Sequence, residues 1–365
     1  MHLYLHIGGE KTGTTAIQRF LRAHRDALQA RGVLFPRSPG ETGNHAALTV
    51  AAEDDDKRDE LRLVFGVRTA DDVDRFRRSL VARLREELAE SKAGIAVLSN
   101  EHCSSRLTEP SEIERLHRML RPLFEKITVV AYIRRQDELV LSHYSSYVAS
   151  GGTDRLSLSA AEDRRSYYDH WPMLAKWAAV FGREALVVRR YHRRWLVGED
   201  ALDDFCAVTG IDASGLARPP RQNESLDATA CEFMRLFNGF LPRVIEGKGT
   251  NPSRGGIERV LGELSRGPVL SLPAAELDAF MASFRDSNAC VAEEFFGGAL
   301  EEAGDPLFGG PDAGRARSEQ PDLTLEIAMG IFARLWERKQ SEVLRLRQTI
   351  RALRQDSEGA NSGPR

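Results

Sequence analysis

The segment that constrains this chain most is a glycine-rich turn at residues 8–13. An apolar run rich in strand formers, with Leu3, Leu5 and Ile7, precedes the turn. After it, apolar residues recur at helical spacing, namely Ala16, Ile17, Phe20, Leu21 and Leu28. A strand, a glycine-rich turn and a helix in succession are typical of a phosphate-binding loop. Glycines let the backbone approach the anion, and the first N–H groups of the helix point at it. The alternative is a turn that binds nothing.

The position of the lysine within the turn indicates which class of phosphate ester the loop binds. A nucleoside-triphosphate loop reads G-x-x-x-x-G-K-[ST], and Gly8, Gly13 and Thr15 match three of its places. Thr14 stands in the place of the lysine, and the lysine comes three residues earlier, as Lys11. A kinase or ATPase without the lysine that contacts the phosphates would lose most of its activity. The sequence therefore favours a different phosphate ester as the ligand.

Short apolar runs alternate with amphipathic stretches after this turn, and they predict strands at residues 95–98, 127–133 and 186–188. Such alternation implies parallel strands with helices on both faces of the sheet. We therefore expect an α/β fold, a mostly parallel sheet flanked by helices of the P-loop nucleotide-binding type, with helical additions at the C-terminus. Glu101 and His102 follow the first of these runs, and ligands bind beyond the carboxyl ends of such strands.

The chain is predicted to divide into three parts. Residues 1–310 form the α/β domain with its helical additions, residues 311–356 a C-terminal helical segment, and residues 357–365 a polar, disordered tail. Four apolar residues in the helical segment have heptad-like spacing, namely Val343, Leu346, Ile350 and Leu353. Because this covers little more than one heptad pair, we expect the helix to pack on its own domain. A homodimer zipper is the alternative.

Composition excludes several classes of protein. The formal net charge of −3 gives no sign of nucleic-acid binding. No apolar run approaches the length of a membrane helix, and no signal peptide is visible. Four scattered cysteines, at positions 103, 206, 231 and 290, fit neither a metal site nor a disulfide framework. We expect a cytoplasmic protein with no metal.

The segment Lys11-Thr12-Gly13-Thr14-Thr15 resembles the 5′-phosphosulfate loop of the sulfotransferases that use 3′-phosphoadenosine 5′-phosphosulfate (PAPS). Arg134, at the end of the strand at 127–133, and Ser142, eight residues on, resemble the segment that grips the 3′-phosphate in that family. A guanidinium binds phosphate oxygens as a fork, and a hydroxyl adds a donor. The usual Asn-Pro after the arginine is replaced here by Arg135-Gln136.

Two weaker resemblances lie further along the chain. The segment ending in Tyr191 is similar to the one in which a strand of the family delivers a tyrosine near the adenine, although His192-Arg193 replaces the family's acidic pair. The family also closes over the 3′-phosphate with a late basic segment. That role falls to Arg221 or Arg254, and the sequence does not choose between them.

Sulfuryl transfer needs a base for the acceptor hydroxyl and a cation near the leaving phosphate oxygen. The resemblance implies that Lys11 supplies the cation and that Glu101 is the base, since it follows the strand after which the family carries a catalytic histidine or glutamate. His102 and His45 are the alternatives. Neighbours on an extended chain point to opposite sides, so we expect only one of Glu101 and His102 to face the substrate.

The resemblance implies that PAPS is the co-substrate, that no metal is needed, and that the products are a sulfate ester or sulfamate and 3′,5′-ADP. The expected acceptor is a hydroxyl or amine of a glycan, a glycolipid or a small metabolite. Two other functions remain as alternatives: a kinase or ATPase with a degenerate loop, and a non-catalytic protein that binds a partner through its C-terminal helix.

Overall fold

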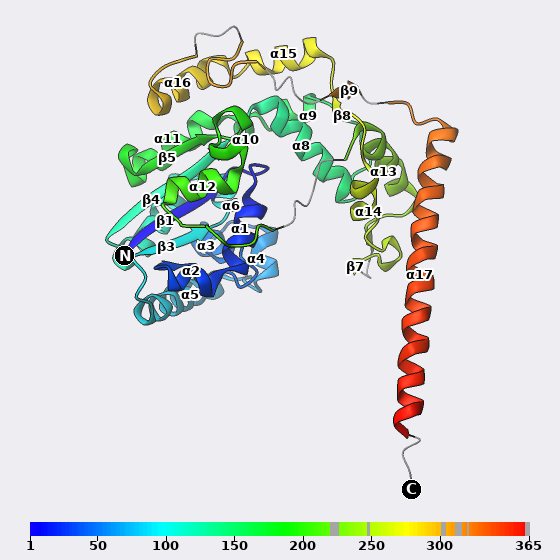
Figure 1. Ribbon diagram of the computed structural model, residues 1–365. Helices are drawn as coiled ribbons and strands as arrows, with labels where there is room; N and C mark the ends of the chain where they lie inside the picture. The colour runs from blue at the N-terminus through cyan, green and yellow to red at the C-terminus, as the bar shows by residue number, and fades with distance from the viewer. Residues whose placement is uncertain (220–225, 247–248, 301–303, 311–315, 320, 362–365) are drawn as a thin grey trace. The chain divides into compact units, whose positions relative to one another are not determined.

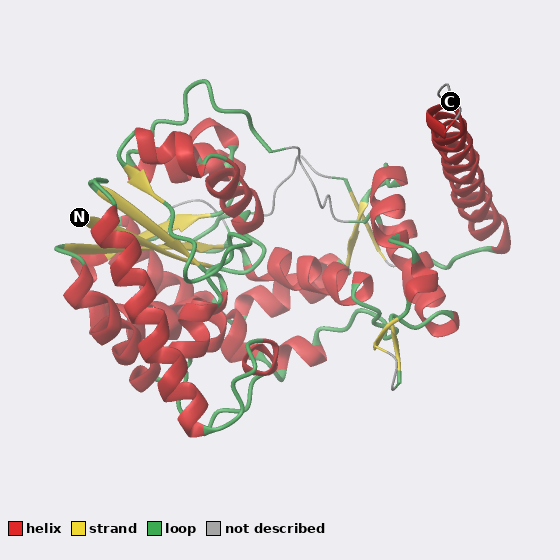
Figure 2. Ribbon diagram, turned by 90° about the horizontal axis from the view of Figure 1, so that it is seen from below, coloured by secondary structure: helices red, strands yellow, loops and turns green. Residues whose placement is uncertain are grey.

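A five-stranded sheet forms the core of the N-terminal part of the computed structural model, with strand order β2–β3–β1–β4–β5 (Figures 1 and 2). The structure describes residues 1–219, 226–246, 249–300, 304–310, 316–319 and 321–361. The strands are β1 (His2–Gly8), β2 (Val33–Leu34), β3 (Ile95–Ser99), β4 (Lys126–Ile133) and β5 (Leu186–Arg190). Every neighbouring pair is parallel, so the predicted α/β fold with a mostly parallel sheet is confirmed.

Helices follow the strands and cover both faces of this sheet (Figure 2). Those of the first part of the chain are α1 (Thr14–Ala23), α2 (Arg25–Ala30), α3 (Ala47–Ala52), α4 (Glu60–Val64), α5 (Ala70–Glu90), α6 (His102–Arg106), α7 (Pro110–Leu120), α8 (Gln136–Ala149), α9 (Ser159–Glu162), α10 (Arg165–Tyr168), α11 (His170–Phe181) and α12 (Ala201–Thr209). Helices α15 (Ala274–Ala282) and α16 (Arg285–Phe296) come later.

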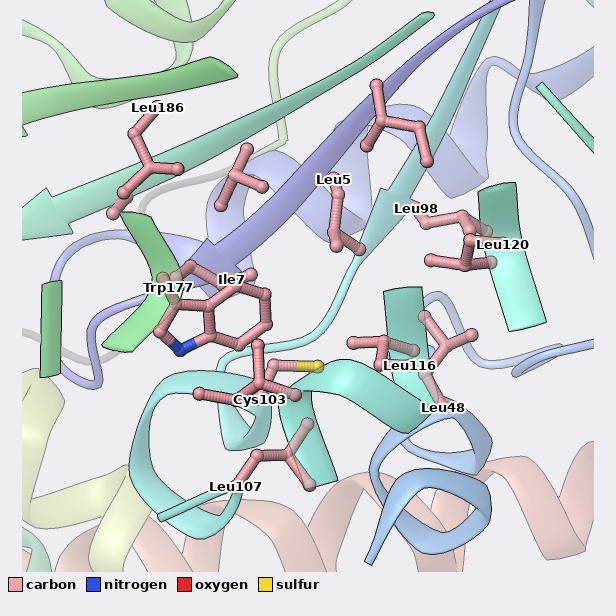
Figure 3. Packing of buried hydrophobic residues seen from close by; sticks show 14 of the residues in the cluster. Leu5, Ile7, Leu48, Leu98, Cys103, Leu107, Leu116, Leu120, Trp177 and Leu186 are labelled. Atoms are coloured by element: carbon pink, nitrogen blue, oxygen red, sulfur yellow. The ribbon is translucent and has the colours of Figure 1, made fainter. Parts of the chain in front are cut away.

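Alternation along β1 explains why its two faces are covered differently. Leu3, Leu5 and Ile7 are fully buried on one face, in a cluster with α3, α5, α7, α11 and α16. Figure 3 shows the indole of Trp177, from α11, beside Ile7. The opposite face of the sheet packs against α1 and α12. Each buried leucine or isoleucine contributes about 1.5–3 kcal/mol, so a one-residue slip of β1 would be strongly opposed.

Strand β1 lies between β3 and β4, with β2 and β5 at the edges of the sheet. The segments that leave the carboxyl ends of β1, β3 and β4 therefore start side by side. In open parallel sheets, ligands bind at this edge, where the strand order changes direction. The fold thus gathers the loop at residues 8–13, Glu101 and Arg134 from three distant parts of the sequence.

The chain separates into two compact units, each built from three segments. The first comprises Met1–His143, Ser157–Gln222 and Ala274–Asp312, and the second comprises Tyr144–Leu156, Asn223–Pro273 and Ala313–Arg365. The sequence instead predicts one domain over residues 1–310 and a helical segment over 311–356. Helix α8 begins in the first unit and ends in the second.

The second unit contains α13 (Ala228–Phe240), the antiparallel pair β6 (Val244–Ile245) and β7 (Gly249–Thr250), α14 (Ile257–Leu264), the parallel pair β8 (Val269–Ser271) and β9 (Arg317–Glu319), and α17 (Leu325–Asn361). Helix α17 is a single long helix (Figure 1) that continues through residue 361, into the stretch predicted to be disordered. Val343, Leu346, Ile350 and Leu353 are all exposed. The helix contacts its own unit through Ile331 and Arg338 instead, and these four residues take no part in that packing.

Among the described residues, no helix combines the length and the apolar character needed to cross a membrane. The four cysteines are all free thiols, three of them buried and Cys290 exposed.

Candidate active site

Close contacts require glycine at Gly9 and Gly13 in the loop between β1 and α1. A Cβ atom at Gly9 would lie 2.3 Å from the carbonyl oxygen of Tyr132 in β4. Gly13 has a φ of +83°, and a Cβ there would lie 2.8 Å from the Cβ of Ala201 in α12. Gly13 is also the N-cap of α1, and it offers no side chain to the first N–H groups of that helix. The N–H groups of Ala16 and Ile17 donate to the Gly13 carbonyl. Those of Thr14 and Thr15 have no preceding helical carbonyl to accept them, so they can receive an anion.

Lys11 is held in this loop in an unusual backbone conformation. Its φ of +63° lies in the left-handed region, which costs a residue with a side chain about 1–2 kcal/mol. The Lys11 carbonyl accepts a hydrogen bond of 3.1 Å from Nη1 of Arg134. Burial lowers the pKa of the Lys11 amine, Arg134 lowers it further, and the carboxylates of Glu10 and Glu101 act in the opposite direction. Strain that persists at a ligand loop indicates a functional position.

The three threonines of the loop have different surroundings. The Thr12 hydroxyl is buried and donates to the Gly9 carbonyl over 2.5 Å, which closes the turn. Thr14 is buried, and its methyl group lies close to Gly8. Thr15 is exposed in the first turn of α1. Thr12 therefore shapes the loop, while Thr15 presents its side chain to the solvent.

Glu101 follows β3 beside the loop and is oriented by two neutral amides. Its Oε2 accepts a hydrogen bond of 2.7 Å from Nε2 of Gln18, and its Oε1 accepts one of 3.2 Å from Nδ2 of Asn44. A Cβ at Gly8 would lie 2.7 Å from the Cβ of Glu101, so the glycine allows this close approach. A carboxylate fixed by amides keeps lone pairs for a further proton donor, which is what a general base requires.

Sequence reasoning missed both Gln18 and Asn44. Gln18 is a buried polar residue on the inner side of α1, and that mismatch with the apolar pattern was the available signal. Its Nε2 also lies 3.3 Å from the Ser99 hydroxyl, which in turn is 2.8 Å from Nδ1 of His6. Asn44 gave no comparable signal because it lies in a polar loop.

His45 is fully buried and is bonded at both ring nitrogens to the backbone. Its Nδ1 accepts the N–H of Ser99 over 3.1 Å, so its Nε2 carries the proton and donates to the Pro36 carbonyl over 2.9 Å. Burial lowers its pKa to about 3. A general base must reach the proton that it takes, and the His45 ring instead joins two segments of the core.

His102 belongs to a cluster around a carboxylate that the sequence analysis missed, Glu10. The Glu10 Oε1 lies 3.7 Å from Nδ1 of His102, and its Oε2 lies 3.6 Å from Nε2 of His143. The Tyr167 hydroxyl lies 3.3 Å from that same His143 nitrogen. Burial alone would raise the pKa of Glu10, but the two imidazoles, Tyr167 and Ser105 outweigh it and lower the pKa far below its usual range. Glu10 is thus ionised beside Lys11.

Arg134 joins the phosphate loop to the segment after β5. Besides its bond to the Lys11 carbonyl, its Nε donates to Glu138 over 3.3 Å. Its guanidinium lies 5.5 Å from the ring centroid of Tyr191, and the Tyr191 ring also lies against Gly13. Ser142 is half-buried on α8. Four predicted binding residues, Lys11, Gly13, Arg134 and Tyr191, therefore come together at one end of the sheet.

Arg135 and Arg254 are held by residues of their own units. Arg135 is buried, and it donates to Asp137 over 2.9 Å and to the Gly309 carbonyl. Arg254 is buried in the second unit, where its guanidinium donates to Asn238 and Glu258, each over 2.8 Å. Arg221 lies outside the described residues.

Because two histidines are buried, we predict that the free energy of unfolding falls in acid. Burial lowers the pKa of His6 and of His45 to about 3, whereas an unfolded histidine titrates near 6.5. The unfolded chain therefore binds more protons between pH 6.5 and 3. We expect the contribution of each histidine to the free energy of unfolding to be fully present above pH 6.5 and to fall by about 1.4 kcal/mol per pH unit below it. Urea unfolding at pH 7, 6 and 5 measures this slope.

His45→Gln is the matched variant, because it removes one of these two histidines and keeps a polar side chain there. The free energy of unfolding of this variant should change less steeply with pH than that of the wild type, by about 1.4 kcal/mol per pH unit, which corresponds to one proton. A wild-type free energy of unfolding that stays constant from pH 7 to pH 5 would contradict the assignment.

No protein-family model matches this chain, and no curated protein matches it significantly. Among solved structures, the chain is similar to a crystal structure of a sulfotransferase from Alicyclobacillus acidocaldarius, with 18% sequence identity and a TM-score of 0.38. The similarity covers 66% of this chain and 92% of the other.

Proposed function

We propose that this protein is a sulfotransferase that uses PAPS to sulfate a hydroxyl or amine. The observation that carries the proposal is the direct link between two predicted binding elements, since Arg134 donates to the backbone of Lys11 itself. Glu101 lies beside the same loop. A cation, an arginine fork, a free helix N-terminus and an oriented carboxylate at one sheet edge are the groups that sulfuryl transfer from a nucleotide requires.

The residues present fit this co-substrate. When bound, PAPS supplies a sulfuryl group that is activated by its phosphate leaving group. The N–H groups at the start of α1 and the Lys11 ammonium would hold the 5′-phosphosulfate, and the close approach at Gly9 and Gly13 leaves the backbone uncovered there. Arg134 and Ser142 would hold the 3′-phosphate, and Tyr191 would border the adenine. These roles rest on the resemblance of the three segments, and the position of each side chain is compatible with them.

Two side chains divide the chemical work in this proposal. Glu101 takes the proton from the acceptor, and Gln18 and Asn44 keep its carboxylate turned toward the site. Lys11 places a positive charge where negative charge develops on the leaving oxygen, which is where a preorganised cation is most effective. The proposed acceptor is a glycan, a glycolipid or a small metabolite, and the scattered cysteines are the reason for proposing the cytoplasm as the compartment.

Ligand-induced thermal stabilisation tests the proposal against its rivals. We expect 3′,5′-ADP at 100 times its Kd to stabilise the protein by about 2.7 kcal/mol, and ATP with Mg²⁺ to have a much smaller effect. The reverse result would indicate a kinase or ATPase. No effect of either nucleotide would indicate a non-catalytic protein. Acceptors are then screened with PAPS that carries labelled sulfate.

Arg134→Ala should mainly raise the KM for PAPS, by about 10- to 100-fold, because a charge-assisted hydrogen bond to a phosphate is worth about 1.5–3 kcal/mol. Arg134→Lys keeps the charge but loses the forked guanidinium, so its KM for PAPS should lie between that of the wild type and that of Arg134→Ala. The matched control is Arg193→Ala, which removes an exposed arginine near Tyr191. Equal KM values for Arg134→Ala and Arg193→Ala would exclude Arg134 from the binding site.

A further inference from the structure

Helix α17 carries a continuous apolar stripe on an exposed face. The stripe, called here the α17 seam, consists of Leu325, Met329, Phe332, Trp336, Lys339, Val343, Leu346, Ile350 and Leu353. Successive members are spaced alternately by four and three residues over about four heptads. The apolar members are between 38% and 79% exposed. Four heptads of this spacing are the length at which a coiled coil becomes the expected structure.

Apart from Lys339, which lies beside Gly255, the seam is distinct from the face by which α17 packs on its own unit. Ile331 is buried, and it lines a cavity with Leu261 of α14. Arg338 forms an ion pair with Glu263, also of α14. Neither Ile331 nor Arg338 is a member of the seam. From residue 341 to residue 350 every side chain is exposed.

The exposed part of α17 therefore gains no burial from the part of the chain that the structure describes. Helices in proteins are stabilised mostly by packing of one face, and isolated segments are marginal in water. Residues 341–350, about 15 Å of helix at 1.5 Å per residue, are left without that packing.

The residue types in the seam indicate what kind of helix would pack against it. Its C-terminal half places β-branched Val343 and Ile350 at the a positions and Leu346 and Leu353 at the d positions. This combination favours two parallel strands. Lys339, at a d position, is the one charged member of the seam, and its ammonium group lies near Gly255 and Glu342 of its own chain.

The charges beside the seam agree with the same arrangement. Glu342 occupies a g position and Arg347 the e position five residues later. In a parallel, in-register pair, Glu342 of one helix faces Arg347 of the other, and symmetry repeats this pair on the opposite side. Within one chain, Glu342 pairs with Lys339 over 2.9 Å at an exposed position, where such an ion pair is weak.

We infer that α17 forms a parallel, in-register, two-stranded coiled coil with α17 of a second copy of this chain. The inference does not depend on the proposed function, because no residue of the seam belongs to the first unit. A basic amphipathic helix that lies on a membrane is the competing arrangement. The strict heptad, the β-branched a positions and the complementary pair favour the second copy.

Sedimentation of the full chain tests this inference. We expect a dimer of twice 40.7 kDa. Leu346→Glu combined with Ile350→Glu should raise the dimer Kd by at least about 100-fold, since it places four like charges in the apolar seam. The matched control is Leu344→Glu, at a b position outside the seam, where the leucine is 56% exposed. The control should remain a dimer. Because all three leucine and isoleucine side chains are exposed, none of these variants should disturb the fold.

Charge reversal tests the orientation. Glu342→Arg and Arg347→Glu should each weaken the homodimer, because each places like charges at both g–e′ contacts. An equimolar mixture of the two variants should form a heterodimer more readily than either forms a homodimer, because both g–e′ contacts then join opposite charges. In an antiparallel pair, g positions face g′ positions and e positions face e′ positions, so neither single variant would weaken the homodimer in this way.

Three results would overturn the inference. The first is a wild-type chain that remains a monomer at about 100 µM, well above the Kd range of stable coiled coils. The second is equal dissociation of the dimer by the seam variant and by Leu344→Glu. The third is a monomer that binds anionic phosphatidylserine vesicles and loses this binding with the seam variant, which would assign α17 to a membrane surface.

Discussion

Lys11→Ala is expected to lower kcat by about 1,000-fold, because it removes the positive charge placed where negative charge develops during transfer. The backbone should remain as it is, since alanine and lysine pay a similar cost for the left-handed conformation at this position. The N–H groups at the start of α1 also remain. We therefore expect 3′,5′-ADP to bind the variant within about tenfold of its wild-type Kd, against a much larger loss of turnover.

The measurement is single-turnover transfer of labelled sulfate to an acceptor found by the screen. Lys92→Ala, which removes an exposed lysine ahead of β3, is the control and should leave kcat unchanged. A Lys11→Ala variant that keeps more than about a tenth of wild-type kcat would show that the lysine does not supply the electrostatic stabilisation proposed for it.

Glu101→Gln should lower kcat by about 100- to 10,000-fold with little change in KM, which is the contribution of a positioned base. The substitution keeps the size of the side chain and one acceptor oxygen, so the loop should be preserved. Gln18→Ala removes the hydrogen bond of 2.7 Å that orients the carboxylate. It should lower kcat less than Glu101→Gln does, by about tenfold, because the base stays present but is less well fixed.

A wild-type kcat in Glu101→Gln would assign the base elsewhere. The next candidates are then His102 and the carboxylate that it faces, Glu10, because the two lie 3.7 Å apart beside the loop. Glu10→Gln and His102→Asn would separate them. His45 is not among these candidates, since both of its ring nitrogens are bonded to backbone groups.

The parts of the fold that were predictable from the sequence are those with local signals. The strand, turn and helix at the N-terminus are continuous in sequence, and the strands β3, β4 and β5 are short apolar runs. Their parallel order follows from alternation with helices. Glu101 and Arg134 could be placed at one sheet edge for the same reason, because both follow strands.

The rest depends on contacts between distant segments. Glu10, in the loop after β1, meets His102, His143 and Tyr167, which come from three different helices, and no local pattern links them. His45 has the sequence surroundings of a loop histidine, because its burial depends on Pro36 and on the end of β3. The two units interleave along the chain, so a division into consecutive segments could not reproduce them.

The left-handed turn at Lys11 has a consequence for how this protein responds to selection. A glycine at that position would relax the loop by about 1 kcal/mol, yet it would carry no ammonium group. The residue that gives the most stable loop at this position is therefore not the residue that supports turnover. A library of variants selected for heat resistance alone would therefore favour glycine at position 11, and these variants would be more stable but inactive.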